Sequence, residues 1–185
     1  MTRVVAGSRG GRRLAVPPGA TRPTSEKVRE AVGSALTALD AIIGVRVLDL
    51  YAGSGAVAIE LLSRGAADAV LVEQAPKAAA TARANIKSVD VKASVIVGDV
   101  VKYVSQPATT RFDVVFIDPP YDVPTDAVRN VVRTLIENGW VATGAVFVVE
   151  RRFRDGTFTW PDGVTAYRDK RYGDTVVFYG LLDPM

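Results

Sequence analysis

The chain is most constrained by a regular alternation of short apolar runs with segments of helical periodicity between residues 45 and 150. The apolar runs, each of strand length, occupy residues 45–50, 69–73, 94–98, 112–118 and 145–150. Helical patterns separate them at residues 56–64, 76–89, 100–105 and 125–138. Strands that alternate with helices form parallel β-α-β units, so this stretch predicts a Rossmann-like, doubly wound α/β sheet with helices on both faces.

Both ends of the chain depart from this alternation. Residues 3–7 and 12–16 flank a turn that contains glycine and predict a short hairpin, after which Thr24 is the expected cap of a helix with one apolar face. Residues 164–171 and 175–182 have no helix between them and predict a terminal antiparallel hairpin. We therefore expect a mostly parallel sheet extended by that hairpin. We divide the chain into an N-terminal arm, residues 1–22, and a domain, residues 23–185.

The composition removes several classes of chemistry. None of the 185 residues is histidine or cysteine, which excludes disulfides, thiolate nucleophiles, zinc sites built from these residues and Ser-His-Asp triads. The chain also lacks an apolar run of ~20 residues that could cross a bilayer, and its first residues do not resemble a secretory signal. We expect a cytoplasmic monomer with neither a metal nor a membrane partner.

Basic residues are concentrated near the N-terminus, where Glu26 is the only acidic residue among the first 29. Charge of one sign gathered in this way suits a phosphate backbone, although a solvated basic arm explains the same pattern. The candidate residues for binding a nucleic acid are Arg3, Arg9, Arg12, Arg13 and Arg22. An alternative nucleic-acid site is a second basic group near the C-terminal hairpin, which comprises Arg151, Arg152, Arg154, Arg168, Lys170 and Arg171.

A glycine turn follows the first strand of the alternating stretch. Asp49 lies in that strand, and Gly53 and Gly55 precede the next helix, so the backbone could approach a ligand at a helix N-terminus. Glu73 ends the second strand, where a carboxylate can accept hydrogen bonds from ribose hydroxyls. Each feature also occurs in other α/β domains, and the third glycine of the dinucleotide fingerprint is absent, but together they favour a nucleoside-containing cofactor. Asp99, after the third strand, could accept an adenine amine or simply begin a helix.

The sequence Asp118-Pro119-Pro120-Tyr121 follows the fourth strand, where ligands of open α/β sheets bind. It could be no more than a rigid turn, because proline fixes the backbone and an aromatic residue often covers a strand end. However, two prolines remove two N–H donors and leave carbonyl acceptors beside a carboxylate and a flat ring. This set suits a planar amine.

With these motifs, the chain resembles class I S-adenosylmethionine-dependent methyltransferases, and more narrowly the bacterial 16S rRNA guanine-N2 methyltransferase family (RsmD). Tyr121 stands where many members have Phe, and Gln74 where many have Asp. The resemblance covers essentially the whole chain, through residues 3–7, 9, 10, 12, 22–24, 28–30, 52–55, 62–64, 118–121 and 138–140.

The family resemblance implies a reaction and a set of site residues. The cofactor would be S-adenosylmethionine, and the substrate a guanine of small-subunit 16S rRNA, presented within a ribosomal particle. We hypothesise that Asp118 and Pro119 localise the lone pair of the guanine N2 amine and stabilise its developing positive charge, while Tyr121 stacks on the base. The cofactor-binding residues would be Asp49, Gly53, Gly55, Glu73, Asp99 and Val100.

Three other functions fit parts of this pattern. A methyltransferase for adenine N6, cytosine N4 or a protein glutamine would share the turn and the Asp118 motif, although glutamine enzymes usually have Asn at this position and DNA enzymes usually have a separate target-recognition region. An RNA-binding ribosome-assembly factor could keep the fold without the chemistry. A nicotinamide oxidoreductase would bind a different cofactor.

Overall fold

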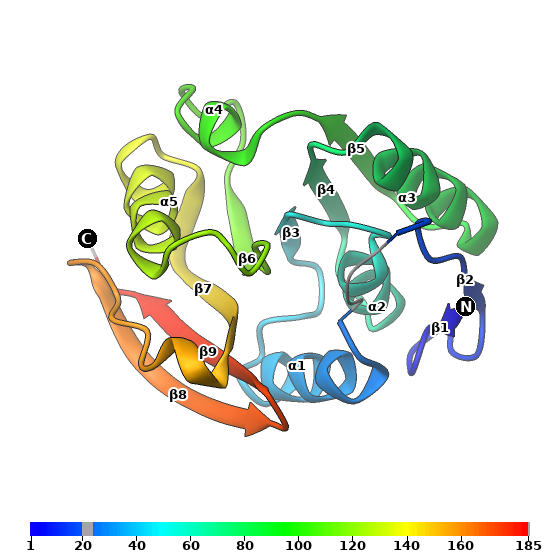
Figure 1. Cartoon of the computed structure of the whole chain (residues 1–185), viewed down its shortest axis with the longest axis horizontal. Coiled ribbons are helices and arrows are strands. Elements are labelled where there is room, and N and C mark those ends of the chain that lie inside the picture. The colour runs from blue at the N-terminus through cyan, green and yellow to red at the C-terminus, as the bar shows by residue number, and fades with distance from the viewer. Residues whose placement is uncertain (20–23, 185) are drawn as a thin grey trace.

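In the computed structural model, which describes residues 1–19 and 24–184, the alternating segments form a seven-stranded mixed sheet (Figure 1). Its strands are β3 (Arg46–Leu50), β4 (Asp68–Glu73), β5 (Ala93–Val97), β6 (Phe112–Ile117), β7 (Val141–Arg152), β8 (Val164–Tyr172) and β9 (Thr175–Leu182). Their order across the sheet is β5-β4-β3-β6-β7-β9-β8. Neighbours from β5 to β7 are parallel, whereas β9 is antiparallel to both β7 and β8. The expected doubly wound sheet and its antiparallel C-terminal extension are confirmed.

Helices cover both faces of the sheet (Figure 1). They are α1 (Glu26–Ala38), α2 (Ala56–Ser63), α3 (Pro76–Val89), α4 (Val100–Val104) and α5 (Thr125–Glu137). Because alternate strand residues point to opposite faces, Leu48 and Leu50 pack in a core with α4 and α5, whereas Val47 packs with α1 and α2. Within residues 1–19 and 24–184, no helix has the length and apolar character needed to cross a membrane.

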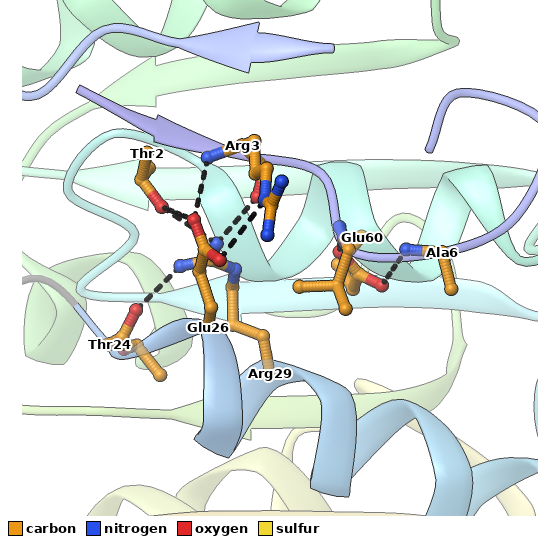
Figure 2. Close-up of polar contacts among 8 residues, drawn as sticks. Thr2, Arg3, Ala6, Thr24, Glu26, Arg29 and Glu60 are labelled. Atoms are coloured by element: carbon orange, nitrogen blue, oxygen red, sulfur yellow. Dashed lines mark hydrogen bonds and ion pairs between the residues drawn. The ribbon is translucent and has the colours of Figure 1, made fainter. Parts of the chain in front are cut away.

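The N-terminal hairpin consists of β1 (Thr2–Arg3) and β2 (Arg13–Leu14). Each of these strands is shorter than the strand that the sequence predicts there. Val4 and Leu14 are buried in an apolar cluster with residues of α2 and α3. Glu60 of α2 is also buried, and its carboxylate accepts hydrogen bonds at 2.7 and 3.0 Å from the two backbone N–H groups that follow Val4 (Figure 2). The hairpin is therefore packed onto the rest of the protein and is not a loose arm.

Two element boundaries differ from those expected. Ser25, and not Thr24, caps α1, because the Ser25 hydroxyl accepts a backbone N–H of the first helical turn at 3.2 Å. β7 extends well beyond the apolar run at residues 145–150, because it pairs with β6 along one edge and with β9 along the other. This pairing brings two arginines into the end of the strand.

The chain changes direction across the sheet at β3. From there it builds β4 and β5 on one side, and then crosses over to build β6 and β7 on the other. Ligands of open α/β sheets bind at such a switch point, beyond the carboxyl ends of the strands. Since β3 and β6 are parallel neighbours, the loops that follow them lie side by side at this edge.

Candidate active site

A cleft of about 960 Å³ opens at the carboxyl ends of β3 and β6. Its walls include the glycine turn after β3, Glu73 at the end of β4 and the Asp118-Pro119-Pro120-Tyr121 loop after β6. Thr24 completes the cleft from the N-terminal side, and Tyr172 and Thr175 from the C-terminal hairpin. The fold thus brings both chemical motifs of the sequence into one cavity, and adds residues from both ends of the chain.

The turn after β3 has an unusual backbone. Tyr51, Gly53 and Gly55 all adopt positive φ, at 62°, 56° and 75°. A Cβ at Gly55 would lie 2.7 Å from the side chain of Leu71, so both space and backbone conformation require glycine there. Non-glycine residues with positive φ concentrate at functional sites, and Tyr51 lines the cleft. The sequence identified the two glycines but carried no signal for Tyr51.

Two backbone amides hold Glu73 at the cleft. One carboxylate oxygen accepts the N–H of Gly53 and the other accepts the N–H of Ala75, both at 2.8 Å. A carboxylate oxygen can accept more than one hydrogen bond, so Glu73 can also receive hydroxyl donors from a ligand. Because these amides already fix its position, the carboxylate needs little reorganisation to do so.

Asp49 lies beneath the turn and is 1% exposed. One of its oxygens accepts the N–H of Ala58, in the first turn of α2, at 3.2 Å. Burial raises the pKa of Asp49 to about 8, and the negative charges of Asp118 and Glu73 contribute in the same direction. Asp49 therefore supports the start of α2, and its ionisation is disfavoured by the carboxylates of Asp118 and Glu73.

Asp99 and Val100 are not among the residues that line the cleft. Asp99 caps α4, because its carboxylate accepts the N–H of Lys102 at 2.9 Å, and Val100 is buried in the core. Burial is the main cause of the raised pKa of Tyr51, and the charge of Asp99 adds to it, which places Asp99 near the turn. The contribution of Asp99 and Val100 to a cofactor site stays a prediction.

Asp118 is held from the N-terminal side of the cleft. The hydroxyl of Thr24 donates a hydrogen bond to Oδ2 of Asp118 at 2.9 Å. The expectation that Thr24 caps α1 is therefore wrong, since the neighbouring serine takes that position and the Thr24 hydroxyl is used in the cleft. Pro119 is buried, whereas Tyr121 is 39% exposed and presents its ring at the cleft.

Two arginines at the end of β7 brace the Asp-Pro-Pro-Tyr loop. Arg151 donates to the carbonyl of Val123 at 2.9 Å and forms an ion pair with Asp155 at 3.2 Å. Arg152 donates to the carbonyl of Tyr121 at 3.1 Å, and its guanidinium lies 4.8 Å from the centre of that ring. Both belong to the second basic group considered as an RNA site, but Arg151 is buried and unavailable to RNA. They follow the apolar run at residues 145–150, but the sequence does not distinguish this bracing role from that of surface cations.

The candidate RNA-binding arginines near the N-terminus are of two kinds. Arg3 pairs with a carboxylate of α1 at 3.3 Å, and Arg9 donates to carbonyls at the end of α3 at 2.9 and 3.1 Å. Arg12 and Arg13 are exposed, and neither side chain makes a hydrogen bond or ion pair within residues 1–19 and 24–184. Arg22 lies outside the described residues. Among the described residues, Arg12 and Arg13 are therefore exposed and free of such contacts, Arg3 is exposed but paired, and Arg9 is partly buried.

A family of proteins matches this chain along almost its entire length. The family model described as Conserved hypothetical protein 95 matches residues 2–180. The chain belongs to this family. Because the match begins in β1 and ends in β9, the family includes both terminal hairpins together with the cleft.

The family member described here is similar to proteins named as methyltransferases. It is 33% identical to "Ribosomal RNA small subunit methyltransferase D" of Escherichia coli (strain K12) over 174 residues, which are 92% of this chain and 85% of that protein. The protein of the same name from Haemophilus influenzae is 30% identical over 184 residues, 97% of this chain and 92% of that one. The solved structure of the putative methyltransferase yhhF from Escherichia coli superposes with a TM-score of 0.88 at 28% identity, over 99% of this chain and 98% of that one.

The hydrogen-bonding groups of the cleft fit a nucleoside-containing cofactor. Glu73 offers fixed acceptors to hydroxyls, and the glycine turn leaves the backbone open to close approach. In the part of the chain that the structure describes, no three Asp or Glu side chains form a group that could hold a metal ion. The residues that line the cleft offer carboxylates, backbone groups, hydroxyls and an aromatic ring.

Proposed function

We propose that the chain transfers a methyl group from S-adenosylmethionine to the exocyclic N2 amine of a guanine in 16S rRNA. The position of Asp118 carries this proposal, because its carboxylate shares one cleft with Glu73 and the glycine turn. Methyl transfer from S-adenosylmethionine to an amine requires that the group which binds the amine and the site which binds the nucleoside lie in the same cavity. Membership of the family, and the similarity to ribosomal RNA small subunit methyltransferases, support the same reaction.

S-adenosylmethionine supplies a methyl group made electrophilic by its sulfonium. Gly53 leaves space for a ligand at the turn, buried Gly55 lets the turn pack against Leu71, and Glu73 presents two oxygens that can accept ribose hydroxyls. The proposed cofactor-binding residues are Asp49, Gly53, Gly55, Glu73, Asp99 and Val100.

The acceptor amine is a weak nucleophile because its lone pair is delocalised into the guanine ring. The carboxylate of Asp118 and the carbonyl of Pro119 accept hydrogen bonds from the two N–H groups of this amine, which localises the lone pair on nitrogen. Formation of the new N–C bond would break the bond between sulfur and the methyl carbon and leave a neutral thioether, so positive charge would develop on the nitrogen beside the fixed carboxylate of Asp118, which would stabilise the transition state more than the ground state. The nitrogen then loses a proton to Asp118 or to solvent. Tyr121, exposed at the cleft, stacks on the base.

Exposed cations on both terminal hairpins suit the phosphates of RNA. Arg12 and Arg13 lie on the N-terminal hairpin, and Arg171 of β8 stacks 3.4 Å from the centre of the Phe153 ring, which is 50% exposed. A pairing of cations with exposed rings is typical of surfaces that bind single-stranded nucleic acid. We place the reaction in the cytoplasm, where a monomer acts on rRNA within a small-subunit particle.

The test uses the purified chain, S-adenosylmethionine with a labelled methyl group, and 16S rRNA from a strain in which the gene is deleted. The RNA is supplied both naked and as small-subunit particles. We expect label in the particles, recovered as N2-methylguanine after digestion to nucleosides. Label only in naked RNA would contradict the particle substrate.

Two other outcomes would replace the proposed reaction. Recovery of N6-methyladenine or N4-methylcytosine would assign a different exocyclic amine. Binding of both ligands without transfer would indicate an assembly factor that has kept the fold without the chemistry.

A further inference from the structure

Arg29 is a buried junction between β1 of the N-terminal hairpin and Thr24, which lines the cleft; Figure 2 shows its hydrogen bonds to both sides. Its side chain donates to the hydroxyl of Thr2 at 2.9 Å and to the carbonyl of Arg3 at 2.7 Å. On the other side it donates to the carbonyl of Thr24 at 2.6 Å. Since Arg29 is 1% exposed, one buried guanidinium fixes β1 relative to the residues that precede α1.

Thr24 carries this link to the proposed reacting group. Its carbonyl accepts the bond from Arg29, while its hydroxyl donates to Oδ2 of Asp118 at 2.9 Å. A hydrogen bond to a charged acceptor is stronger than one between neutral groups, and it restricts how the carboxylate can rotate. The hairpin, Arg29, Thr24 and Asp118 therefore form one continuous series of hydrogen bonds.

A purely structural role explains Arg29 poorly. Burial of a guanidinium is unfavourable, and apolar side chains of similar volume often stabilise a protein at least as well. Its Nε makes no hydrogen bond to any of the described residues, although the charges of Glu60 and Glu26 offset part of the cost of burial. What the guanidinium provides, and an apolar side chain cannot, is a fixed geometry between the hairpin and Thr24.

We propose that Thr24 is a positioning residue for Asp118, and that Arg29 sets Thr24 according to the position of the N-terminal hairpin. This inference rests on the proposed function, in which Asp118 accepts a hydrogen bond from the guanine N2 amine. The same hairpin exposes Arg12 and Arg13, so RNA bound there also steadies the carboxylate at the other end of the series. The hairpin thereby contributes to turnover as well as to RNA binding.

The first experiment removes only the Thr24 hydroxyl. Thr24→Val keeps the side-chain shape, and it should lower kcat for methyl transfer at least ~10-fold, the effect of losing a hydrogen bond to a charged group. The KM for RNA and the affinity for S-adenosylmethionine should change by less than about threefold, because only transition-state positioning is lost. Thr24→Ser keeps the donor and should restore kcat to within about threefold of the wild type. As a matched control, Thr37→Val removes a hydroxyl of α1 that bonds the Gly33 carbonyl, and all three quantities should be unchanged.

The second experiment tests whether the hairpin acts through Thr24. Arg29→Lys keeps the charge but cannot bond both sides of the junction, and should lower kcat as Thr24→Val does. The double variant with Arg29→Lys and Thr24→Val should have the same kcat as Thr24→Val alone, because both changes break the same series of hydrogen bonds. If Arg29→Lys does not fold, Thr2→Val loosens the junction from the hairpin side and replaces it in the cycle.

The outcomes separate this inference from the function on which it rests. An inactive wild-type chain would overturn the proposed reaction, and the positioning role with it. With an active wild type, an unchanged kcat in Thr24→Val, or no recovery in Thr24→Ser, would overturn the positioning role alone. Additive losses in the double variant would overturn the link to the hairpin.

Discussion

The two halves of the cleft are built in different ways. In the cofactor half, residues 49–58 and 73–75, the hydrogen bonds that fix the site join residues 2 to 31 positions apart. In the acceptor half, residues 118–123, they join residues 28 to 94 positions apart, and the partners come from the start of α1 and the end of β7. The cofactor half is thus built from β3, α2, β4 and α3, which follow one another along the chain. The acceptor half exists only when segments from both ends of the protein are in place.

Separate construction implies that each half can be damaged without the other. We therefore expect variants of the acceptor half to lose transfer and keep cofactor affinity, and variants of the cofactor half to do the reverse. A variant that affected both equally would show that the halves act as one unit.

The largest effect is expected from Asp118→Ala. Transfer should fall at least ~100-fold, because a preorganised electrostatic partner of the transition state is lost. Affinity for S-adenosylmethionine should stay within a few-fold, since no contact of the cofactor half is removed. Single-turnover assays and calorimetry measure the two quantities, with Asp126→Ala, an exposed carboxylate of α5, as the control. Near-normal transfer would refute the proposed role of Asp118.

Glu73→Ala tests the opposite half. Binding of S-adenosylmethionine should weaken by about 1.5 to 3 kcal/mol, the range for hydrogen bonds to a charged group. The enzyme saturated with cofactor should still transfer methyl, because the acceptor half is intact. Calorimetry checks the affinity, and Glu137→Ala on α5 is the matched control. An unchanged affinity would reduce Glu73 to a carboxylate that only stabilises the turn.

Asp49 is the buried carboxylate of the cofactor half, and its protonation affects the stability of the protein. Burial raises its pKa from 3.8 to about 8, so between these values the folded protein holds a proton that the unfolded chain has released. The stability that this proton contributes is complete below the lower value and is lost as the pH rises towards 8. The amide of Asp49→Asn stays neutral at every pH. Its free energy of unfolding should therefore gain ~1.4 kcal/mol relative to that of the wild type for each unit by which the pH rises in this window. Denaturant titrations across the window measure this gain, and parallel pH profiles would contradict the raised pKa.

The smallest effect concerns RNA and should spare the cofactor half entirely. A double variant, Arg12→Ala with Arg13→Ala, should flatten the dependence of log K for RNA on log salt by about 1 to 1.5, because each lost phosphate contact contributes ~0.7 on single strands. Affinity for S-adenosylmethionine should not change. The matched control is the pair Arg129→Ala and Arg133→Ala on α5. An unchanged slope in a folded double variant would move the RNA site to the exposed cations of β8, Arg168, Lys170 and Arg171.

The fold and the cofactor half could be predicted from the sequence because their determinants are local. Apolar periodicity records which face of each strand or helix is buried, and every expected strand and helix of the alternating stretch is present. The glycines of the turn and Glu73 stand at the ends of consecutive strands, so the topology of one unit is enough to bring them together. Tyr51 escaped prediction because its strained backbone leaves no trace in its residue type.

The acceptor half could be predicted only in part. The Asp118 motif is visible in the sequence, but the side chains that hold it act across long stretches of chain. Thr24 resembles a helix cap because threonine favours that position, and only the structure shows that the adjacent Ser25 takes it. Arg151 and Arg152 resemble surface cations because arginine is usually exposed, and the pairing of β7 with two neighbours decides otherwise.

The long reach of the acceptor half also bears on how the protein is made. A chain leaving the ribosome completes the segments of the cofactor half early, whereas the end of β7 and the β9 strand that pairs with it appear last. Contacts between distant residues also close larger loops and form late in folding. We expect a growing polypeptide to acquire its cofactor pocket well before it can act on any substrate. We expect methyl transfer to begin only after β9 has left the ribosome and paired with β7.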